Sequence, residues 1–162
     1  MNWDDGATRN RTEGGGVARK PGYLSPSVAR RAMQRQELTG IQVAARVGVN
    51  PSTVRNWLAG RTAPTPAKLA DLASVLGLDI RDLTAVVPGR ETLGDLRIHA
   101  ALTQSEVATL VGLSQSAYSA IEQGGAALSD ALCGQLAEAY GSSSEEIRAA
   151  WTRARDTLKG LH

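Results

Sequence analysis

Residues 38–60, LTGIQVAARVGVNPSTVRNWLAG, return in altered form 64 positions later as residues 102–124, LTQSEVATLVGLSQSAYSAIEQG. Both segments belong to a longer alignment without gaps, residues 38–83 against residues 102–147, in which thirteen of the 46 positions are identical. Several of the other positions are apolar in both copies. Similarity at one fixed offset over this length indicates that a structural unit has been duplicated.

Each copy carries the signals of several short helices. Thr39 with Gln42, and Thr103 with Glu106, have the spacing of a capping box, which starts a helix. A glycine follows each of these helices, where a residue with positive φ is often needed. Pro51 suits the first position of the next helix, because a proline there loses no hydrogen bond. The sequence therefore predicts two helices joined by a short turn in each copy, a helix-turn-helix.

The duplication divides the chain into two domains. We expect a basic, Gly-rich and disordered arm at residues 1–24, a first domain at residues 25–85, a linker at residues 86–90, and a second domain at residues 91–162 that ends in an extended helix. Aromatic residues make up only 4% of the chain and Phe is absent, so the cores must be built from Ala, Val, Leu and Ile. The predicted fold class is all-α, with two tandem five-helix domains.

Several classes of protein are excluded by what the sequence lacks. No apolar run approaches the ~20 residues that cross a bilayer, and no nucleophile–base pattern or phosphate-binding loop is present. His99 and Cys133, with only His162 to add, do not suggest a zinc site. We therefore expect no enzyme activity, no metal and no cofactor. The single cysteine, Cys133, allows no internal disulfide and fits a reducing cytoplasm.

Charge is distributed unevenly between the two domains. Residues 1–64 carry ten Lys or Arg side chains against four Asp or Glu, whereas residues 91–147 carry one arginine, Arg97, against eight acidic side chains. Affinity for DNA rests largely on Lys and Arg, so the first domain has the charge of a DNA-binding module. The opposite charge of the second domain indicates a different partner.

The residues of the second copy resemble the lambda-repressor-like family, also called the Cro or XRE type of helix-turn-helix. The match is carried by Leu102, Thr103, Gln104, Ala108, Gly112, Ser114, Tyr118, Ile121 and Gly124. The first copy fits the same pattern, except that it has Gly40 where the family has glutamine. The resemblance implies two tandem domains of this fold, which we call the first and the second repeat.

The resemblance also implies binding to a specific sequence of double-stranded DNA, with the third helix of a domain in the major groove. The candidate DNA-binding residues of the first repeat are Ser52, Thr53, Arg55 and Asn56 for bases, and Arg46, Arg61 and Arg35 for phosphates. Arg55 suits guanine and Asn56 suits adenine, because each forms paired hydrogen bonds with that base. The alternative for these side chains is a solvated helix surface. The leading hypothesis is a transcriptional regulator of bacterial or phage type.

The second repeat allows two interpretations. Gln104, Gln115, Ser116 and Ser119 match polar DNA-contacting positions of the family, which favours an auxiliary reader of bases. The basic residues are lost, however, and eight acidic side chains should repel a phosphate backbone. We therefore expect that the second repeat does not bind DNA alone, and that its acidic surface serves self-association or a protein partner.

The last helix suggests a dimer. Ile147, Trp151 and Leu158 recur close to the spacing of a heptad stripe, which is typical of a helix that pairs with a second copy. The alternative is that the same stripe packs on the second repeat of its own chain.

Two further hypotheses remain open at this point. Arg9, Arg11, Arg19 and Lys20 make a candidate minor-groove arm, against the alternative of a tail without a role. For the whole chain, the competing function is a protein-interaction adaptor, such as an antitoxin or a polymerase- or regulator-binding factor, that keeps the helix-turn-helix for another partner.

Overall fold

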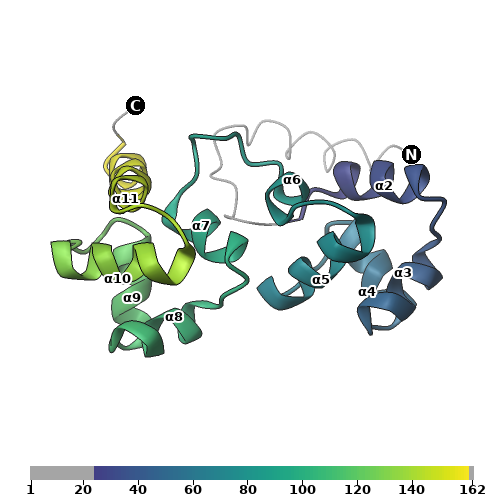
Figure 1. Cartoon of the computed structure of the whole chain (residues 1–162), viewed down its shortest axis with the longest axis horizontal. Helices are drawn as coiled ribbons and strands as arrows, with labels where there is room; N and C mark the ends of the chain where they lie inside the picture. Colours follow the sequence, from purple (N-terminus) through teal and green to yellow (C-terminus); the bar gives the residue numbers. More distant parts are fainter. Residues whose placement is uncertain (1–23, 161–162) are drawn as a thin grey trace, which may run out of the picture.

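The computed structural model describes residues 24–160, and within them it contains ten α-helices and no strand (Figure 1). The first repeat comprises α2 (Pro26–Arg35), α3 (Gly40–Val47), α4 (Pro51–Leu58), α5 (Pro66–Leu76) and α6 (Ile80–Thr84). The second comprises α7 (Leu93–His99), α8 (Gln104–Val111), α9 (Gln115–Glu122), α10 (Asp130–Tyr140) and α11 (Ser144–Leu158). The prediction of an all-α fold with two tandem five-helix units is confirmed.

The predicted caps fix where the helices of the two helix-turn-helix units begin and end. Thr39 Oγ1 accepts from the backbone N–H of Gln42 at 3.2 Å, and Gln42 Oε1 accepts from the backbone N–H of Thr39 at 2.8 Å. The equivalent reciprocal bonds join Thr103 and Glu106 at the start of α8. Gly48 closes α3 with φ of 85°, a left-handed conformation that favours glycine.

Each repeat has its own core, and the two cores use equivalent positions. The first includes Val43, Val54, Trp57, Leu69, Leu72 and Leu83, and the second includes Leu93, Val107, Tyr118, Leu136 and Ile147. The second core differs in being partly polar. Tyr118 and Tyr140 stand where the first repeat has Val54 and Leu76, and their hydroxyl groups hydrogen-bond to each other. Burial raises the pKa of both phenols far above the ordinary value, so both stay protonated.

Helix α11 packs on its own repeat, which corrects the predicted dimer stripe. Ile147 is fully buried in the second core, and the Trp151 indole Nε1 donates to the backbone oxygen of Ala126 at 3.1 Å. Of the three stripe residues only Leu158 is free, at 61% exposure. The alternative left open by the sequence, packing on the second repeat, is the arrangement found. None of the helices between residues 24 and 160 is long and apolar enough to span a membrane.

The two repeats touch through α5 and α6 of the first and α7 of the second. Ile98 on α7 is only 8% exposed, and it belongs to the core cluster of the first repeat rather than the second. Beside it, His99 Nε2 lies 2.9 Å from Thr84 Oγ1 at the end of α6. Burial lowers the pKa of His99 and favours the neutral ring. We call this set of contacts the inter-repeat contact.

Candidate nucleic-acid interface

Helix α4 presents a polar face opposite the core of the first repeat. Val54 and Trp57 are buried and hold the helix on the domain, whereas Ser52 and Arg55 are exposed. Asn56 is half-buried, and positions 52, 55 and 56 share one face because residues three and four apart are neighbours on a helix. Thr53 is half-buried on the same first turns. The face has the width and chemistry to contact base edges.

Two further exposed arginines belong to the same helix-turn-helix. Arg46 lies in the last turn of α3, the helix that packs on α4, and Arg61 follows the end of α4. Arg61 Nη1 lies 3.5 Å from Asn56 Oδ1, a contact that brings the guanidinium beside the polar face. Among residues 24–160, neither Arg46 nor Arg55 forms an ion pair with a carboxylate. Their positive charges therefore remain available for a phosphate or a base.

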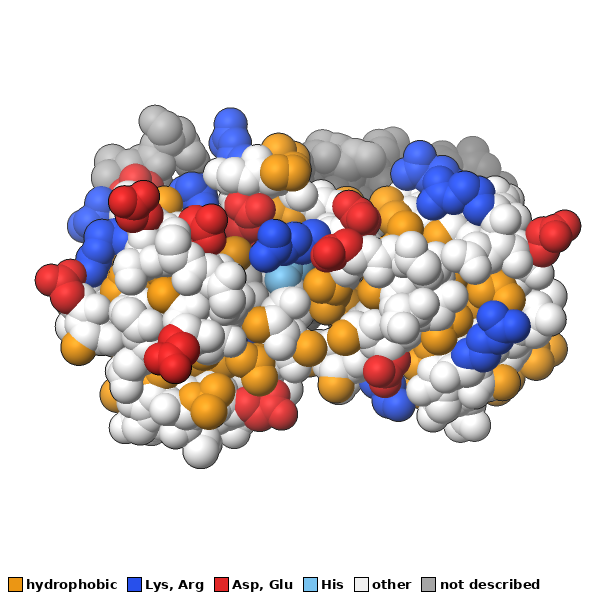
Figure 2. Space-filling view, in the orientation of Figure 1, with side chains coloured by type: hydrophobic (Ala, Val, Ile, Leu, Met, Phe, Trp, Pro, Cys, Tyr) orange, Lys and Arg blue, Asp and Glu red, His pale blue; other side chains and the backbone are white. Residues whose placement is uncertain are grey.

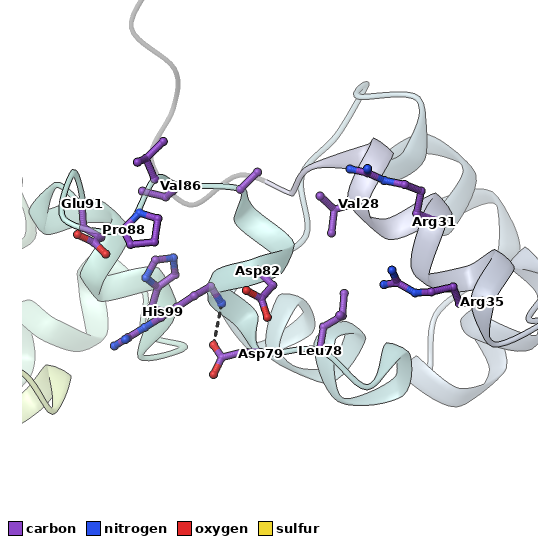
Figure 3. A pocket seen from close by; sticks show the side chains of 13 residues that line it. Val28, Arg31, Arg35, Leu78, Asp79, Asp82, Val86, Pro88, Glu91 and His99 are labelled. Atoms are coloured by element: carbon purple, nitrogen blue, oxygen red, sulfur yellow. Dashed lines mark hydrogen bonds between the residues drawn. The ribbon is translucent and has the colours of Figure 1, made fainter.

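The basic residues of α2 are placed differently. The Arg30 guanidinium donates to the backbone oxygen of Leu58 at 2.6 Å, so it closes the end of α4 and positions that helix. Arg35 does not join the α3–α4 surface. With Arg31 it lines a hollow between α2, α6 and the linker, in which Leu78, Asp82, Pro88 and His99 also lie (Figure 3).

In the second repeat, the four candidate residues lie around the N-terminal ends of α8 and α9. Gln115 and Ser116 are exposed in the first turn of α9. Gln104 is half-buried, and its Nε2 donates to Glu122 Oε1 at 3.1 Å and lies 3.5 Å from Ser119 Oγ. Gln104 and Ser119 are therefore held by the protein, whereas Gln115 and Ser116 are exposed. The Ser116 hydroxyl lies 3.4 Å from the Ser114 hydroxyl.

A buried ion pair fixes the position of α9. Arg97 on α7 binds Glu122 through Nε to Oε2 at 2.7 Å and Nη2 to Oε1 at 3.1 Å, and it also donates to the backbone oxygen of Leu102. Burial by itself lowers the pKa of Arg97, but the hydrogen bond and charge of Glu122 outweigh it, so the pKa is raised. The sequence alone does not predict this pair. The available signal was that both residues align with apolar ones, Met33 and Leu58.

The acidic side chains of the second repeat do not gather on its helix-turn-helix surface. Figure 2 shows them scattered over the left-hand lobe. Glu122 is buried against Arg97, Asp95 is buried at the start of α7, and Asp130 pairs with Arg148. The others are Glu91 before α7, Glu106 in the capping box of α8, Glu138 on α10, and Glu145 and Glu146 in the first turn of α11. The surface around Gln115 is thus mainly neutral and polar, although the whole repeat is acidic.

No basic side chain of the first-repeat interface has a basic counterpart in the second. The residues that align with Arg46, Arg55 and Arg61 are Leu110, Ser119 and Gly125. The predicted basic arm around Arg9, Arg11, Arg19 and Lys20 lies outside the residues that the structure describes. Within residues 24–160, no three His, Cys, Asp or Glu side chains are grouped so that they could hold a metal ion.

Comparison with known proteins decides the family. A family model described as helix-turn-helix matches the chain twice, at residues 30–83 and at residues 93–147. The chain belongs to this helix-turn-helix family of the Cro type. Domains of the family bind double-stranded DNA and serve in regulators, so the chain is placed among DNA-binding helix-turn-helix proteins. Neither the curated proteins nor the solved structures that were compared contained a match.

Proposed function

We propose that this protein is a sequence-specific transcriptional regulator of bacterial or phage type, in which α4 of the first repeat enters the major groove. The observation that carries the proposal is the polar face of α4, with Ser52 and Arg55 exposed and the Arg61 guanidinium beside Asn56. A helix presented in this way fits the major groove of B-DNA, which admits an α-helix. A regulator works on the chromosome, so we place it in the cytoplasm, associated with the nucleoid.

Within this proposal, the chemistry of each side chain decides whether it contacts a base, a sugar or a phosphate. Arg55 and Asn56 contact base edges, where paired hydrogen bonds distinguish guanine and adenine from the other bases. Ser52 and Thr53 contact bases or sugars nearby, and Arg46 and Arg61 contact phosphates. Arg35 lies in the hollow beside α6, so it belongs to this set only if the duplex reaches that far along α2.

The second repeat acts in this proposal as an auxiliary reader. Its support is the neutral polar surface around Gln115 and Ser116, which does not repel a phosphate backbone as the total charge of the repeat would suggest. Without Lys or Arg at these positions, it binds only when the first repeat has already anchored the chain. The alternative role of a dimerisation module through α11 loses support because Ile147 and Trp151 pack inside their own repeat.

A protein-interaction adaptor is the second candidate function, and two exposed apolar side chains favour it. Ile41 on α3 is 69% exposed, and Leu110 on α8 is 61% exposed. Leu110 aligns with Arg46, so a phosphate-binding side chain in one repeat corresponds to a surface leucine in the other. Apolar side chains on a helix-turn-helix surface suit a protein partner more than DNA.

The test is a salt series with the full-length protein and duplex DNA. We expect affinity to fall steeply with salt, because each phosphate contact releases counterions. Arg55→Ala should relax base preference in a site selection, at a cost of about 1–3 kcal/mol for the preferred site. Arg61→Ala should weaken all sequences alike and flatten the salt slope by about one unit.

Arg90→Ala, an exposed arginine of the linker, serves as the matched control and should change neither property. If the full chain fails to bind duplex DNA even at low salt, the regulator is ruled out and the adaptor takes its place. If Arg55→Ala selects the same sequences as the parent, the base contact of Arg55 is ruled out.

A further inference from the structure

The inter-repeat contact uses different surfaces on the two repeats, and in this sense it is one-sided. This limits the kind of DNA site that the two repeats can bind together. A contact with two-fold symmetry uses the same patch on both partners. Here the first repeat contributes α5 and α6, whereas the second contributes α7, the counterpart of α2. The two helix-turn-helix units are therefore joined head to tail.

The equivalent residues confirm that no second, symmetric contact exists within residues 24–160. Ile98 is buried in the first core, but its counterpart Gln34 is exposed on α2. His99 bonds Thr84, but its counterpart Arg35 lines the hollow beside α6. Arg148, the counterpart of Thr84, instead pairs with Asp130 on its own repeat.

The two helix-turn-helix pairs nevertheless lie toward one side of the molecule. In Figure 1 both helix-turn-helix pairs, α3–α4 and α8–α9, lie toward the lower edge. A shallow pocket joins them, because Ala63 and Pro64 after α4 line it together with Gln104, Ser105 and Gln115 of the second repeat. A duplex that follows this edge meets the arginines of the first repeat and then the exposed Gln115 and Ser116 side chains of the second.

We propose that one chain binds a single asymmetric duplex site, made of two adjacent segments that are not inverted copies of each other. The inference rests on the proposed function and adds the class of DNA site to it. A palindromic site mirrors a two-fold axis in the protein, and the inter-repeat contact has no such axis. The first repeat anchors one segment through phosphates, and Gln115 and Ser116 select bases in the other.

The test begins with selection of binding sites from a random duplex pool by the full-length protein. Native mass spectrometry then counts the chains on the enriched duplex. We expect an asymmetric motif with one chain bound. Gln115→Ala should lose preference in one segment only, by about fivefold to 150-fold for a lost base contact. Gln135→Ala, an exposed glutamine on α10, is the matched control and should keep the parent motif.

A second measurement reverses that one segment in place within the selected duplex. Affinity should fall by a similar factor, because the inter-repeat contact holds the second repeat in one orientation relative to the first. A palindromic motif occupied by two chains overturns this inference but leaves the proposed function intact. A motif that Gln115→Ala leaves unchanged has the same two consequences. A selection that enriches no motif overturns the proposed function, and this inference with it.

Discussion

At the scale of single residues, the two repeats differ most where Arg97 and Glu122 replace Met33 and Leu58. The second repeat therefore exchanges two apolar side chains for a buried, bidentate ion pair that also holds Gln104. A buried pair of this kind adds little net stability over well-packed apolar residues, but removing one partner leaves an uncompensated charge in the core. The pair therefore matters mainly for where it places α9 and Gln104.

If Arg97 and Glu122 depend on each other in this way, the stability effects of replacing them should not be additive. Glu122→Leu, which copies the residue of the first repeat, should lower the free energy of unfolding by about 3–5 kcal/mol, because Arg97 is left buried without a partner. Adding Arg97→Met should restore most of that loss. Urea unfolding of the three variants and the parent measures both effects. Exposed Glu138→Leu is the control, and a double variant no more stable than the single one contradicts the argument.

The same residues mark how far the sequence could predict the candidate site. Exposed positions such as Arg55 and Gln115 follow from the repeat and the family pattern, because helix periodicity alone decides which side faces the core. The partner of Arg97 did not follow, since residues 25 positions apart meet only through tertiary packing. The net charge of the second repeat also did not show where its acidic side chains lie, because a sum over the sequence does not say which face carries them.

At the scale of elements, the helix boundaries were largely predictable and the packing of α11 was not. The capping boxes at Thr39 and Thr103 are local, so three or four residues determine them. The stripe on α11 was equally visible in the sequence, but periodicity cannot tell whether an apolar face meets its own domain or a second chain. In the structure α11 lies against the loop that follows α9, and at Gly124 there is no room for a Cβ beside the α11 backbone.

A matched pair of glycine substitutions tests this packing. At Gly124, with φ of 84°, an added Cβ would lie 2.4 Å from the backbone nitrogen of Arg155. At the equivalent Gly60, with φ of 74°, it would meet nothing within 4 Å. Gly60→Ala should therefore cost only the left-handed conformation, about 1–2 kcal/mol. Gly124→Ala should cost clearly more, because α11 must move away. Thermal unfolding of both variants checks this, and equal losses would show that α11 does not pack there.

At the scale of the whole molecule, the inter-repeat contact decides whether the repeats behave as one body. The sequence does not say to which core Ile98 of α7 belongs, and in the structure this side chain packs in the core of the neighbouring repeat. A linker of a few residues permits many relative orientations, so the contact rather than the linker fixes the geometry of the two DNA-facing surfaces.

Ile98→Gln copies the exposed Gln34 of α2 and should loosen that contact. Losing the burial of one isoleucine costs about 1.5–3 kcal/mol. We expect the parent to unfold in one calorimetric transition and the variant in two, as each repeat keeps its own core. Ile41→Gln, at a largely exposed position, is the control and should unfold like the parent. Two transitions in the parent, or one in the variant, would show that Ile98 does not couple the repeats.

The one-sided contact also has a consequence for assembly. Identical domains joined head to tail leave one unused contact surface at each end. Repeated addition of further domains through these surfaces would produce a filament. Here both ends have been altered. The α2 end carries Gln34 and Arg35 instead of the isoleucine and histidine that would insert into a neighbour, and at the other end α11 continues past the point where α6 stops and folds back on its own repeat. We expect these ends to act as caps, as the terminal units of solenoid proteins do, so that no third domain adds to the two.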